Sequence, residues 1–172
     1  MIILLGYMGS GKTVVGQVVS RFIGFEFIDL DHYIEFKEGE KISEIFQKKG
    51  VIYFRQIENK YLKELIDEDR KIILSLGGGT PCYYNHMDML SSKSFIHTIY
   101  LNAGIKTLTN RLWDNKENRP LISGINDKDD LLEFIGKHLF ERRPFYQRAR
   151  YQITVDDKSV SEISNEIVST LF

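Results

Sequence analysis

The segment from Gly6 to Thr13, GYMGSGKT, constrains the fold more than any other part of the chain. It follows a short apolar run at residues 2–5 and precedes a stretch in which apolar side chains recur at helical spacing. A glycine-rich turn between a strand and a helix can point its backbone N–H groups inward, and the helix adds the positive end of its dipole. The pattern G-x-x-x-x-G-K-S/T in this context therefore predicts a phosphate-binding loop.

Two residues of this loop have distinct expected tasks at a bound triphosphate. The Lys12 side chain is placed to reach the β- and γ-phosphates, and the Thr13 hydroxyl is placed to ligate Mg²⁺. A chance glycine-rich turn is the alternative, and the flanking strand and helix patterns argue against it. A GTPase would need a segment that recognises guanine, usually Asn-Lys-x-Asp. The nearest match in this chain is NKEN at residues 115–118, which ends in Asn and not Asp.

Short apolar runs alternate with amphipathic stretches along the whole chain. Strands are expected at residues 2–5, 25–28, 71–76, 95–101 and 151–155. Helices are expected at residues 12–23, at 32–68 in pieces broken near Gly39 and Gly50, and at 104–113, 127–149 and 160–171. This alternation predicts an α/β fold with a parallel sheet and helices on both of its faces.

The 172-residue chain carries 23 Lys and Arg against 24 Asp and Glu, which gives a net charge of −1. A chain without a basic excess does not attract nucleic acid or an anionic membrane globally, so any anion site must be local. Its single cysteine, Cys82, allows no intrachain disulfide, and we interpret it as a packed thiol rather than a reactive one. We expect a cytoplasmic protein with neither nucleic acid nor membrane as a partner.

Two carboxylates follow the second expected strand, in the segment FIDLDHY. Asp29 and Asp31 lie just past the end of that strand, where ligands bind in open parallel sheets. We expect one carboxylate to help hold the hydration shell of the metal and the other to accept hydrogen bonds from substrate hydroxyls. The alternative for Asp31 is a structural task as the cap of the next helix.

An arginine and a run of glycines mark two further candidate positions. Arg55 lies in an expected helix beside Phe54, and this apolar setting would make it a strong anion clamp. The alternative is a solvated helix arginine that pairs with Glu58 or Glu64. Residues 77–79 are three consecutive glycines after the third strand, which indicates a close approach of ligand or backbone.

Further arginines occur at two places in the second half of the chain. Arg119 lies in the polar segment 114–124, and a cation on a closing flap can cover the γ-phosphate and exclude water. The segment FERRPFYQRAR at residues 140–150 contains Arg142, Arg143, Arg148 and Arg150. We expect most of these four side chains to be solvated and at most two to reach an active site.

Together these motifs resemble the shikimate kinase family over the whole chain. The resemblance is carried by GYMGSGKT at 6–13, DLD at 29–31, FR at 54–55, GGG at 77–79, RPL at 119–121 and ER-x-P-x-Y at 141–146. It implies one domain over residues 1–172 with a three-layer P-loop fold and a five-stranded parallel sheet. It also implies a substrate-binding helical segment at about 31–60, a lid at about 112–124, and ATP-dependent phosphorylation of the 3-hydroxyl of shikimate on the route to aromatic amino acids.

The resemblance also assigns site residues by motif. It implies catalytic roles for Lys12, Asp31 and Arg119, and a magnesium site at Thr13 and Asp29, with Asp29 acting through water. The implied ATP contacts are Gly9, Ser10, Gly11, Lys12, Thr13, Val14 and Arg119. The implied shikimate contacts are Asp31, Arg55, Gly77, Gly78, Gly79 and Arg142. We expect ATP and shikimate to be the partners of a monomeric chain.

Two other functions stay open on the sequence. A related small-molecule kinase, such as a gluconate kinase, would also bind a polyhydroxy carboxylate, and Arg55 and Arg142 beside the glycine run favour shikimate. A non-catalytic ATP-dependent switch would need no acceptor pocket, which Asp31 and Arg119 argue against.

Overall fold

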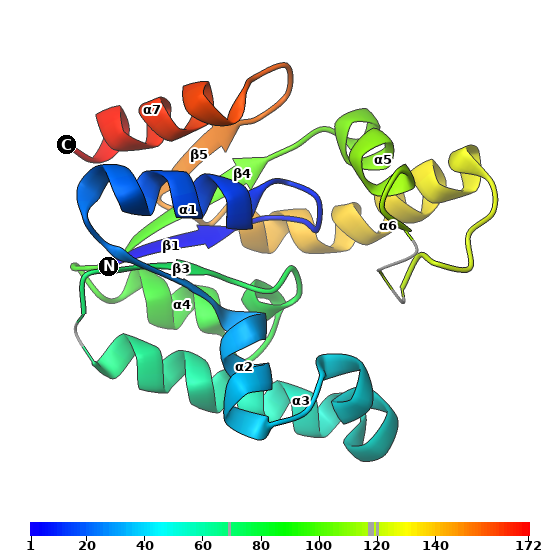
Figure 1. Cartoon of the computed structure of the whole chain (residues 1–172), viewed down its shortest axis with the longest axis horizontal. Coiled ribbons are helices and arrows are strands. Elements are labelled where there is room, and N and C mark those ends of the chain that lie inside the picture. Colours follow the sequence, from blue (N-terminus) through cyan, green and yellow to red (C-terminus); the bar gives the residue numbers. More distant parts are fainter. Residues whose placement is uncertain (69, 117–118, 120) are drawn as a thin grey trace.

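The structure is a computed structural model that describes residues 1–172 except residues 69, 117, 118 and 120. Five parallel strands form one sheet with the order β2-β3-β1-β4-β5 (Figure 1). The strands are β1 (Ile2–Leu5), β2 (Glu26–Asp29), β3 (Ile72–Ser75), β4 (His97–Asn102) and β5 (Tyr151–Thr154). The predicted α/β fold with a five-stranded parallel sheet is confirmed.

Helices connect the strands as the sequence pattern predicted, with two additions. The helices are α1 (Lys12–Ile23), α2 (Leu30–Glu38), α3 (Ile42–Asp67), the 3₁₀ turn η1 (Thr80–Cys82), α4 (His86–Ser91), α5 (Ile105–Trp113), α6 (Lys128–Tyr146) and α7 (Val160–Leu171). The sequence pattern did not predict η1 and α4, which are too short to show a helical period. In the described part of the chain, no helix is long and apolar enough to cross a membrane.

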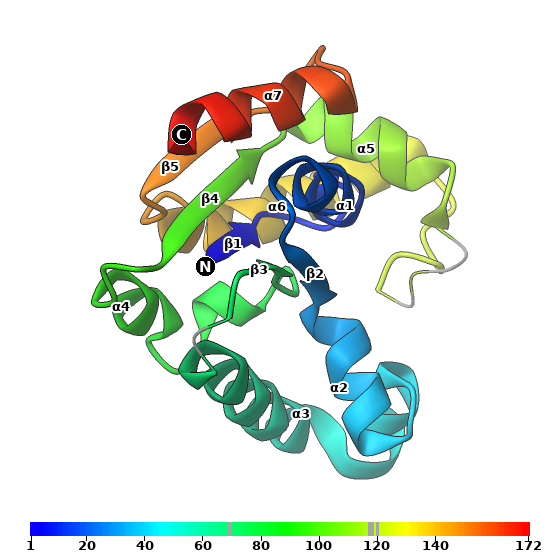
Figure 2. The ribbon, with the colours of Figure 1, turned by 60° about the vertical axis from the view of Figure 1, so that its left-hand side comes forward.

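The two predicted breaks in the helical stretch after β2 are confirmed. Gly39 ends α2 with a φ of 69°, a left-handed conformation that glycine adopts without strain. Gly50 interrupts α3 with a φ of 80° and a ψ of 174°, so the two parts of α3 point in different directions. As Figure 2 shows, α2 and α3 form an arm beyond the β2 edge of the sheet.

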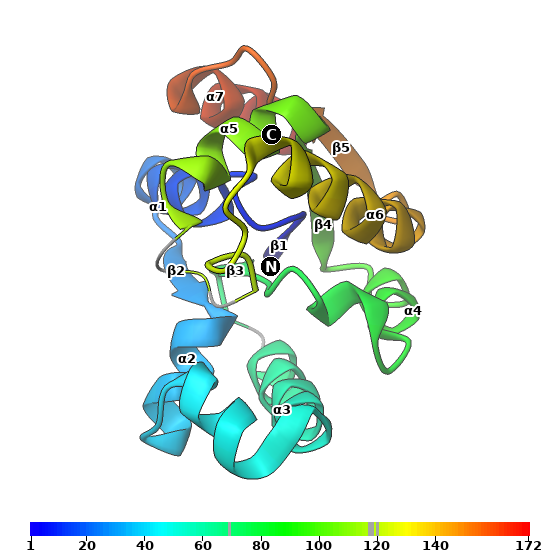
Figure 3. The same ribbon diagram turned by 90° about the vertical axis from the view of Figure 1, so that its right-hand side faces the viewer.

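The sheet lies between two layers of helices. Helices α1 and α7 pack side by side on one face, and α4 and α6 lie on the other (Figures 1 and 3). All residues of β1 and β3 are buried, as expected for parallel strands that are covered on both faces. This explains why their sequences, IILL and IILS, are apolar runs without alternation.

The strand register gathers the candidate motifs at one edge of the sheet. Ser75 at the end of β3 pairs with Leu4 of β1 on one side and with Asp29 of β2 on the other. The loops that follow these three strands are the phosphate-binding loop, the segment of two carboxylates and the glycine run. In open parallel sheets, this carboxyl edge is where ligands bind.

Candidate functional site

The glycine-rich loop has the backbone geometry that its pattern predicted. Gly9 has a φ of +81°, and a methyl group placed on it would lie 3.1 Å from the Leu112 side chain of α5. The loop then passes into α1 at Gly11, whose φ of 97° precedes the first helical residue, Lys12. Arg111 of α5 donates a hydrogen bond from Nη1 to the Gly9 carbonyl at 3.2 Å, so α5 supports the loop from outside.

Lys12 lies folded back on its own loop. Its Nζ donates hydrogen bonds to the carbonyl oxygens of Gly6 at 2.9 Å and Tyr7 at 3.0 Å, and the residue is 9% exposed. Burial lowers the pKa of this ammonium group to about 8, against the opposing effect of Asp31 and Asp29. A phosphate anion near Nζ would favour the charged form and raise this pKa again.

Asp29 performs two tasks with its two carboxylate oxygens. Its Oδ1 accepts hydrogen bonds from the backbone N–H groups of Asp31 at 3.1 Å and His32 at 3.4 Å, which caps α2. Its Oδ2 accepts a hydrogen bond from the Thr13 hydroxyl at 3.1 Å. The alternative that gave Asp31 the capping role is therefore wrong, because the cap is Asp29 and Asp31 lies inside the helix.

Because Asp29 caps α2, the Asp31 side chain has no capping role, and it points toward the glycine run at residues 77–79. A methyl group placed on Gly77 would lie 2.9 Å from Asp31 Oδ1. Burial, with the nearby carboxylates of Asp29 and Glu58, raises the pKa of Asp31 to about 6, while Lys12 and Arg55 act in the opposite direction. A buried carboxyl group with its pKa displaced toward neutrality is a frequent feature of working sites.

Each glycine of the run lies against a different site residue. Gly77 faces Asp31. A methyl group placed on Gly78 would lie 3.5 Å from Arg142 Nη1, and one placed on Gly79 would lie 2.6 Å from Arg55 Nη2. The methyl position of Gly78 is also 3.5 Å from the Met8 backbone nitrogen and 3.7 Å from the Gly6 carbonyl oxygen. A side chain at Gly77 or Gly79 would therefore clash with Asp31 or Arg55, whereas a methyl group at Gly78 would meet Arg142 and the phosphate-binding loop at ordinary contact distances.

Arg55 is held by an acid and two aromatic rings. Its Nη1 donates to Glu58 Oε2 at 2.5 Å, and its guanidinium carbon lies 4.2 Å from the centre of the Tyr83 ring and 5.1 Å from that of Phe54. The side chain is 15% exposed. The predicted alternative was right about the partner and wrong about the setting, because Arg55 pairs with Glu58 but is not a solvated surface residue.

Glu58 is a site residue that the sequence interpretation did not assign. It is 1% exposed and its other oxygen, Oε1, accepts a hydrogen bond from the Thr80 hydroxyl at 2.6 Å. A buried charge needs partners of this kind, so Glu58 joins Arg55 to the end of the glycine run. The available signal was its position three residues after Arg55, which places both on one helix face.

Arg142 reaches the site from α6 without an acidic partner among the described residues. Its guanidinium carbon lies 5.9 Å from the centre of the Tyr7 ring. Tyr146, one turn further along α6, donates a hydrogen bond to the Gly78 carbonyl at 2.5 Å and so ties the helix to the glycine run. The structure therefore places Asp31, Arg55 and Arg142 around residues 77–79.

Arg119 lies in the segment between α5 and α6, whose residues 117, 118 and 120 fall outside the described residues. Figure 3 looks at the carboxyl ends of the strands, and the described part of this segment lies in front of β3. Arg119 acts electrostatically on Lys12, lowering its pKa. Of the other predicted ATP contacts, Ser10 is fully buried, whereas Val14 is 53% exposed.

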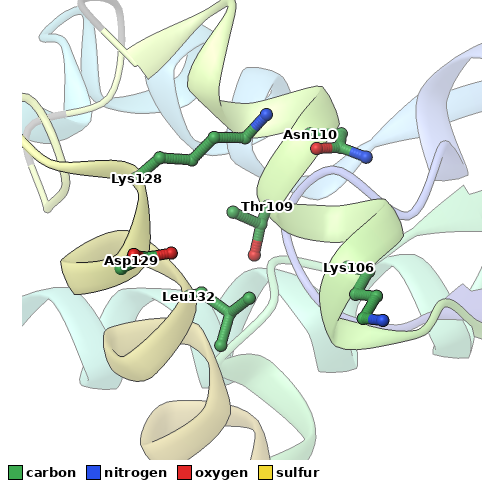
Figure 4. Close-up of a pocket in the computed structure, with 6 residues that line it drawn as sticks. All are labelled: Lys106, Thr109, Asn110, Lys128, Asp129 and Leu132. Carbon is green, nitrogen blue, oxygen red and sulfur yellow. The ribbon is translucent and has the colours of Figure 1, made fainter.

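A separate hollow of about 220 Å³ lies between α5 and α6 (Figure 4). Lys106, Thr109 and Asn110 line it from α5, and Lys128, Asp129 and Leu132 from α6, with Lys128 extending toward Asn110. None of these residues belongs to the predicted site.

Comparisons with known proteins agree with this geometry. A family model described as shikimate kinase matches residues 8–172. A shikimate kinase from Flavobacterium psychrophilum is 42% identical over 172 residues, which cover 99% of this chain and 98% of that protein. The crystal structure of a shikimate kinase from Bacteroides thetaiotaomicron has a TM-score of 0.90 and 34% identity, with 99% of this chain and 97% of that chain covered. A shikimate kinase from Acinetobacter baumannii, solved in complex with shikimate, has a TM-score of 0.83 and 29% identity, with 99% and 91% covered.

Proposed function

The chain belongs to the shikimate kinase family, and on that premise we propose that it transfers the terminal phosphoryl group of ATP to the 3-hydroxyl of shikimate. The products are shikimate 3-phosphate and ADP, on the route to chorismate and the aromatic amino acids. The observation that carries this proposal is the position of Gly78, which separates Arg142 from the phosphate-binding loop by the width of one residue. An acceptor held by Arg142 therefore lies next to a bound triphosphate.

The acceptor is a small ring with one carboxylate, and two guanidinium groups are available for that charge. Arg55 and Arg142 both approach the glycine run, at Gly79 and Gly78. A guanidinium fork matches a carboxylate with two parallel hydrogen bonds. Gly77, Gly78 and Gly79 leave the backbone open to the acceptor ring, and a side chain at Gly77 or Gly79 would also displace Asp31 or Arg55.

Asp31 orients the hydroxyl that is phosphorylated. Its carboxylate accepts a hydrogen bond from that hydroxyl, and a pKa of about 6 makes it a competent acceptor for the proton late in the reaction. A loose phosphoryl-transfer transition state asks little of a base, so orientation is the larger contribution.

Lys12 and Arg119 stabilise the negative charge that moves with the phosphoryl group. Lys12 leaves the carbonyl oxygens of Gly6 and Tyr7 and binds the phosphates, and Arg119 covers the reacting group when the lid segment closes. The backbone N–H groups of Gly9, Ser10 and Gly11 hold the phosphates, and Val14 borders the loop on α1.

Thr13 and Asp29 fit a magnesium site. Their oxygens lie 3.1 Å apart in the present structure, and two oxygen donors beside a phosphate loop suit a hard cation that keeps several waters. Thr13 would hold Mg²⁺ directly and Asp29 through water. When bound, Mg²⁺ would neutralise phosphate charge and align the triphosphate.

We propose a monomer as the working unit. The near-neutral net charge and the single cysteine agree with a cytoplasmic location. Sedimentation in the presence of ATP and shikimate would test the monomer, and a stable dimer that binds shikimate across its interface would contradict it.

A coupled assay of ADP release tests the proposed function. Purified protein is supplied with ATP and Mg²⁺ and with shikimate, with gluconate or with no acceptor. We expect ADP release only when shikimate is the acceptor. Release with gluconate would support the related small-molecule kinase, and ATP binding without release under any condition would support a non-catalytic switch.

A second arm of the assay tests whether the enzyme recognises the carboxylate of the acceptor. Shikimate with its carboxylate reduced to an alcohol keeps the three hydroxyls and loses the charge. We expect the wild-type protein to discriminate strongly against this analogue, because the two guanidinium groups would then lack an anion. Equal rates with both acceptors would show that neither arginine reads the carboxylate.

A further inference from the structure

Tyr7 connects the phosphate-binding loop to the helix that carries Arg142. Its carbonyl oxygen accepts a hydrogen bond from Lys12 Nζ at 3.0 Å, and its ring centre lies 5.9 Å from the guanidinium carbon of Arg142. Its hydroxyl oxygen is 2.9 Å from His138 Nδ1. One residue thus contacts a cation of the donor half through its main chain and a cation of the acceptor half through its ring. The loop motif leaves this position unspecified.

His138 fixes the orientation of the Tyr7 ring. The two rings meet edge to face, with centres 5.6 Å apart and planes at 89°. Phe134, one turn earlier on α6, packs against the His138 ring at 5.3 Å. Tyr7 is 1% exposed, and a buried hydroxyl group needs a hydrogen-bond partner, which His138 supplies.

Arg142 has no ion pair with an acid in the described part of the chain. Its guanidinium carbon lies 5.9 Å from the centre of the Tyr7 ring, its Nη1 lies 3.5 Å from a methyl position on Gly78, and its charge acts to lower the pKa of the Tyr146 hydroxyl. A cation within about 6 Å of an aromatic ring centre is attracted to the ring face. His138 precedes Arg142 by four residues, one helical turn, so one face of α6 carries both the guanidinium and the anchor of the ring that supports it.

We propose that Tyr7 and His138 form a positioning pair: their hydrogen bond fixes the ring on which the Arg142 guanidinium rests and so holds that guanidinium in place for the acceptor carboxylate. The proposal rests on the proposed function, because the carboxylate is that of shikimate. Neither residue of the pair touches the reacting atoms, so their effect passes through Arg142.

The variant Tyr7→Phe tests the pair because it keeps the ring and removes the hydroxyl. We expect the KM for shikimate to rise about three- to tenfold, the scale of one lost buried hydrogen bond. The KM for ATP and kcat should change less than about twofold, because the carbonyl that faces Lys12 is retained. Tyr61→Phe is the matched control: Tyr61 is 5% exposed and donates its hydroxyl to Glu38 at 2.7 Å, away from Arg142, so its KM values should be those of the wild type.

A second background separates positioning from general stability. In Arg142→Lys, where the planar guanidinium is gone, adding Tyr7→Phe should raise the KM for shikimate no further. His138→Phe should reproduce Tyr7→Phe, and His138→Gln, which keeps a hydrogen-bonding group, should restore most of the affinity. If Tyr7→Phe folds poorly, the comparison of His138→Phe with His138→Gln decides the question.

Several outcomes would overturn the pair. One is an equal rise in the KM values for ATP and shikimate, and another is a full Tyr7→Phe effect in the Arg142→Lys background. If the wild-type enzyme is active and Tyr7→Phe has the same KM for shikimate, the positioning role of the pair is refuted and the proposed function still holds. An inactive wild-type protein would remove both, so the two failures are distinguishable.

Discussion

The donor and acceptor halves of the site are built in opposite ways. The centre of the donor half is one continuous segment, residues 6–13, which presents backbone groups and one cation, Lys12, and to which only Asp29 and Arg119 are added from elsewhere in the proposed site. The acceptor half gathers Asp31, Arg55, Arg142 and residues 77–79 from four separate segments, and its working groups are charged side chains. A local loop can form its site wherever a strand meets a helix, whereas a dispersed site exists only when distant elements are packed correctly.

The two halves also hold their charges differently. Lys12 has the carbonyl oxygens of its own loop as partners, and its pKa is lowered to about 8 by burial. Asp31 is buried beside two further carboxylates, Asp29 and Glu58, and its pKa is raised to about 6. Burial thus displaces the pKa of each group toward its neutral form, and removing the Asp31 charge should stabilise the fold while it lowers turnover.

The largest effect is expected in the donor half, from Lys12→Met. The fold should persist, because glycines and backbone groups build the loop. Turnover should fall at least about a hundredfold, since a cation that follows the transferred charge is lost. Steady-state kinetics together with thermal unfolding would check this, and a variant with near-normal kcat would refute the donor assignment.

Asp31→Asn should lower activity and raise stability. We expect turnover to fall about tenfold to a hundredfold as hydroxyl orientation is lost. The wild-type Asp31 pKa is raised from 3.8 to about 6 in the folded state. Between these values the folded state binds more protons than the unfolded state, so this group makes stability fall as the pH rises from about 4 to 6 and leaves it lower above that range.

The stability arm of the same experiment is measured by urea unfolding at several pH values. At pH 7 we expect the free energy of unfolding of Asp31→Asn to exceed that of the wild type by about 1–3 kcal/mol. At pH 4 this difference should nearly vanish. A variant that is less stable than the wild type at pH 7 would show that Asp31 is a structural partner and not a strained working group.

Arg55→Lys tests whether the acceptor half depends on geometry as well as charge. Lysine keeps the positive charge but loses the guanidinium fork and its stacking between two rings. Shikimate binding should weaken roughly ten- to a hundredfold, on the scale of one charge-assisted hydrogen bond, while ATP binding stays close to normal. Calorimetric titration of each ligand would measure both, and unchanged shikimate affinity would exclude Arg55 from the acceptor site.

A pair of glycine variants tests whether the donor and acceptor halves bind their ligands independently. Gly79 has a φ of −90°, so Gly79→Ala is allowed by the backbone and acts only through the clash with Arg55 Nη2 at 2.6 Å. We expect about a tenfold loss of shikimate affinity with ATP affinity retained. Gly9 has a φ of +81°, which strains any other residue, so Gly9→Ala should lower ATP affinity and retain shikimate affinity.

Gly136→Ala is the control for these two variants, because its methyl group would meet nothing closer than 3.8 Å inside α6. It should leave both affinities unchanged. Equal losses of ATP and shikimate affinity in both Gly79→Ala and Gly9→Ala would mean that the two halves move as one unit.

The smallest effect concerns the metal. Thr13→Val removes the hydroxyl and keeps the shape, and Asp29→Asn weakens the outer shell of the ion. We expect each to raise the magnesium concentration for half-maximal activity by a few-fold, measured by titration at saturating ATP. An unchanged magnesium titration in both variants would place the metal at other residues.

The sequence alone determined the features whose causes are local. The phosphate-binding loop, the strands 2–5 and 71–76 and the helix breaks at Gly39 and Gly50 each follow from neighbouring residues, so periodicity and glycine positions sufficed. The short helices η1 and α4 escaped prediction because three to six residues show no period. The strand order β2-β3-β1-β4-β5 depends on which crossovers pack together, and no local pattern encodes that.

The way in which distant side chains share the site depends on tertiary contacts. The structure shows three such contacts. It gave the capping role to Asp29 rather than Asp31, buried Glu58 beneath Arg55, and joined Tyr7 to His138 across 131 positions of sequence. Spacing identified Arg55 and Glu58 as possible partners, but it could not distinguish a solvated pair from a buried one. Burial and orientation are set by what other segments place around a residue, and those contacts exist only after the sheet and its helices have closed over one another.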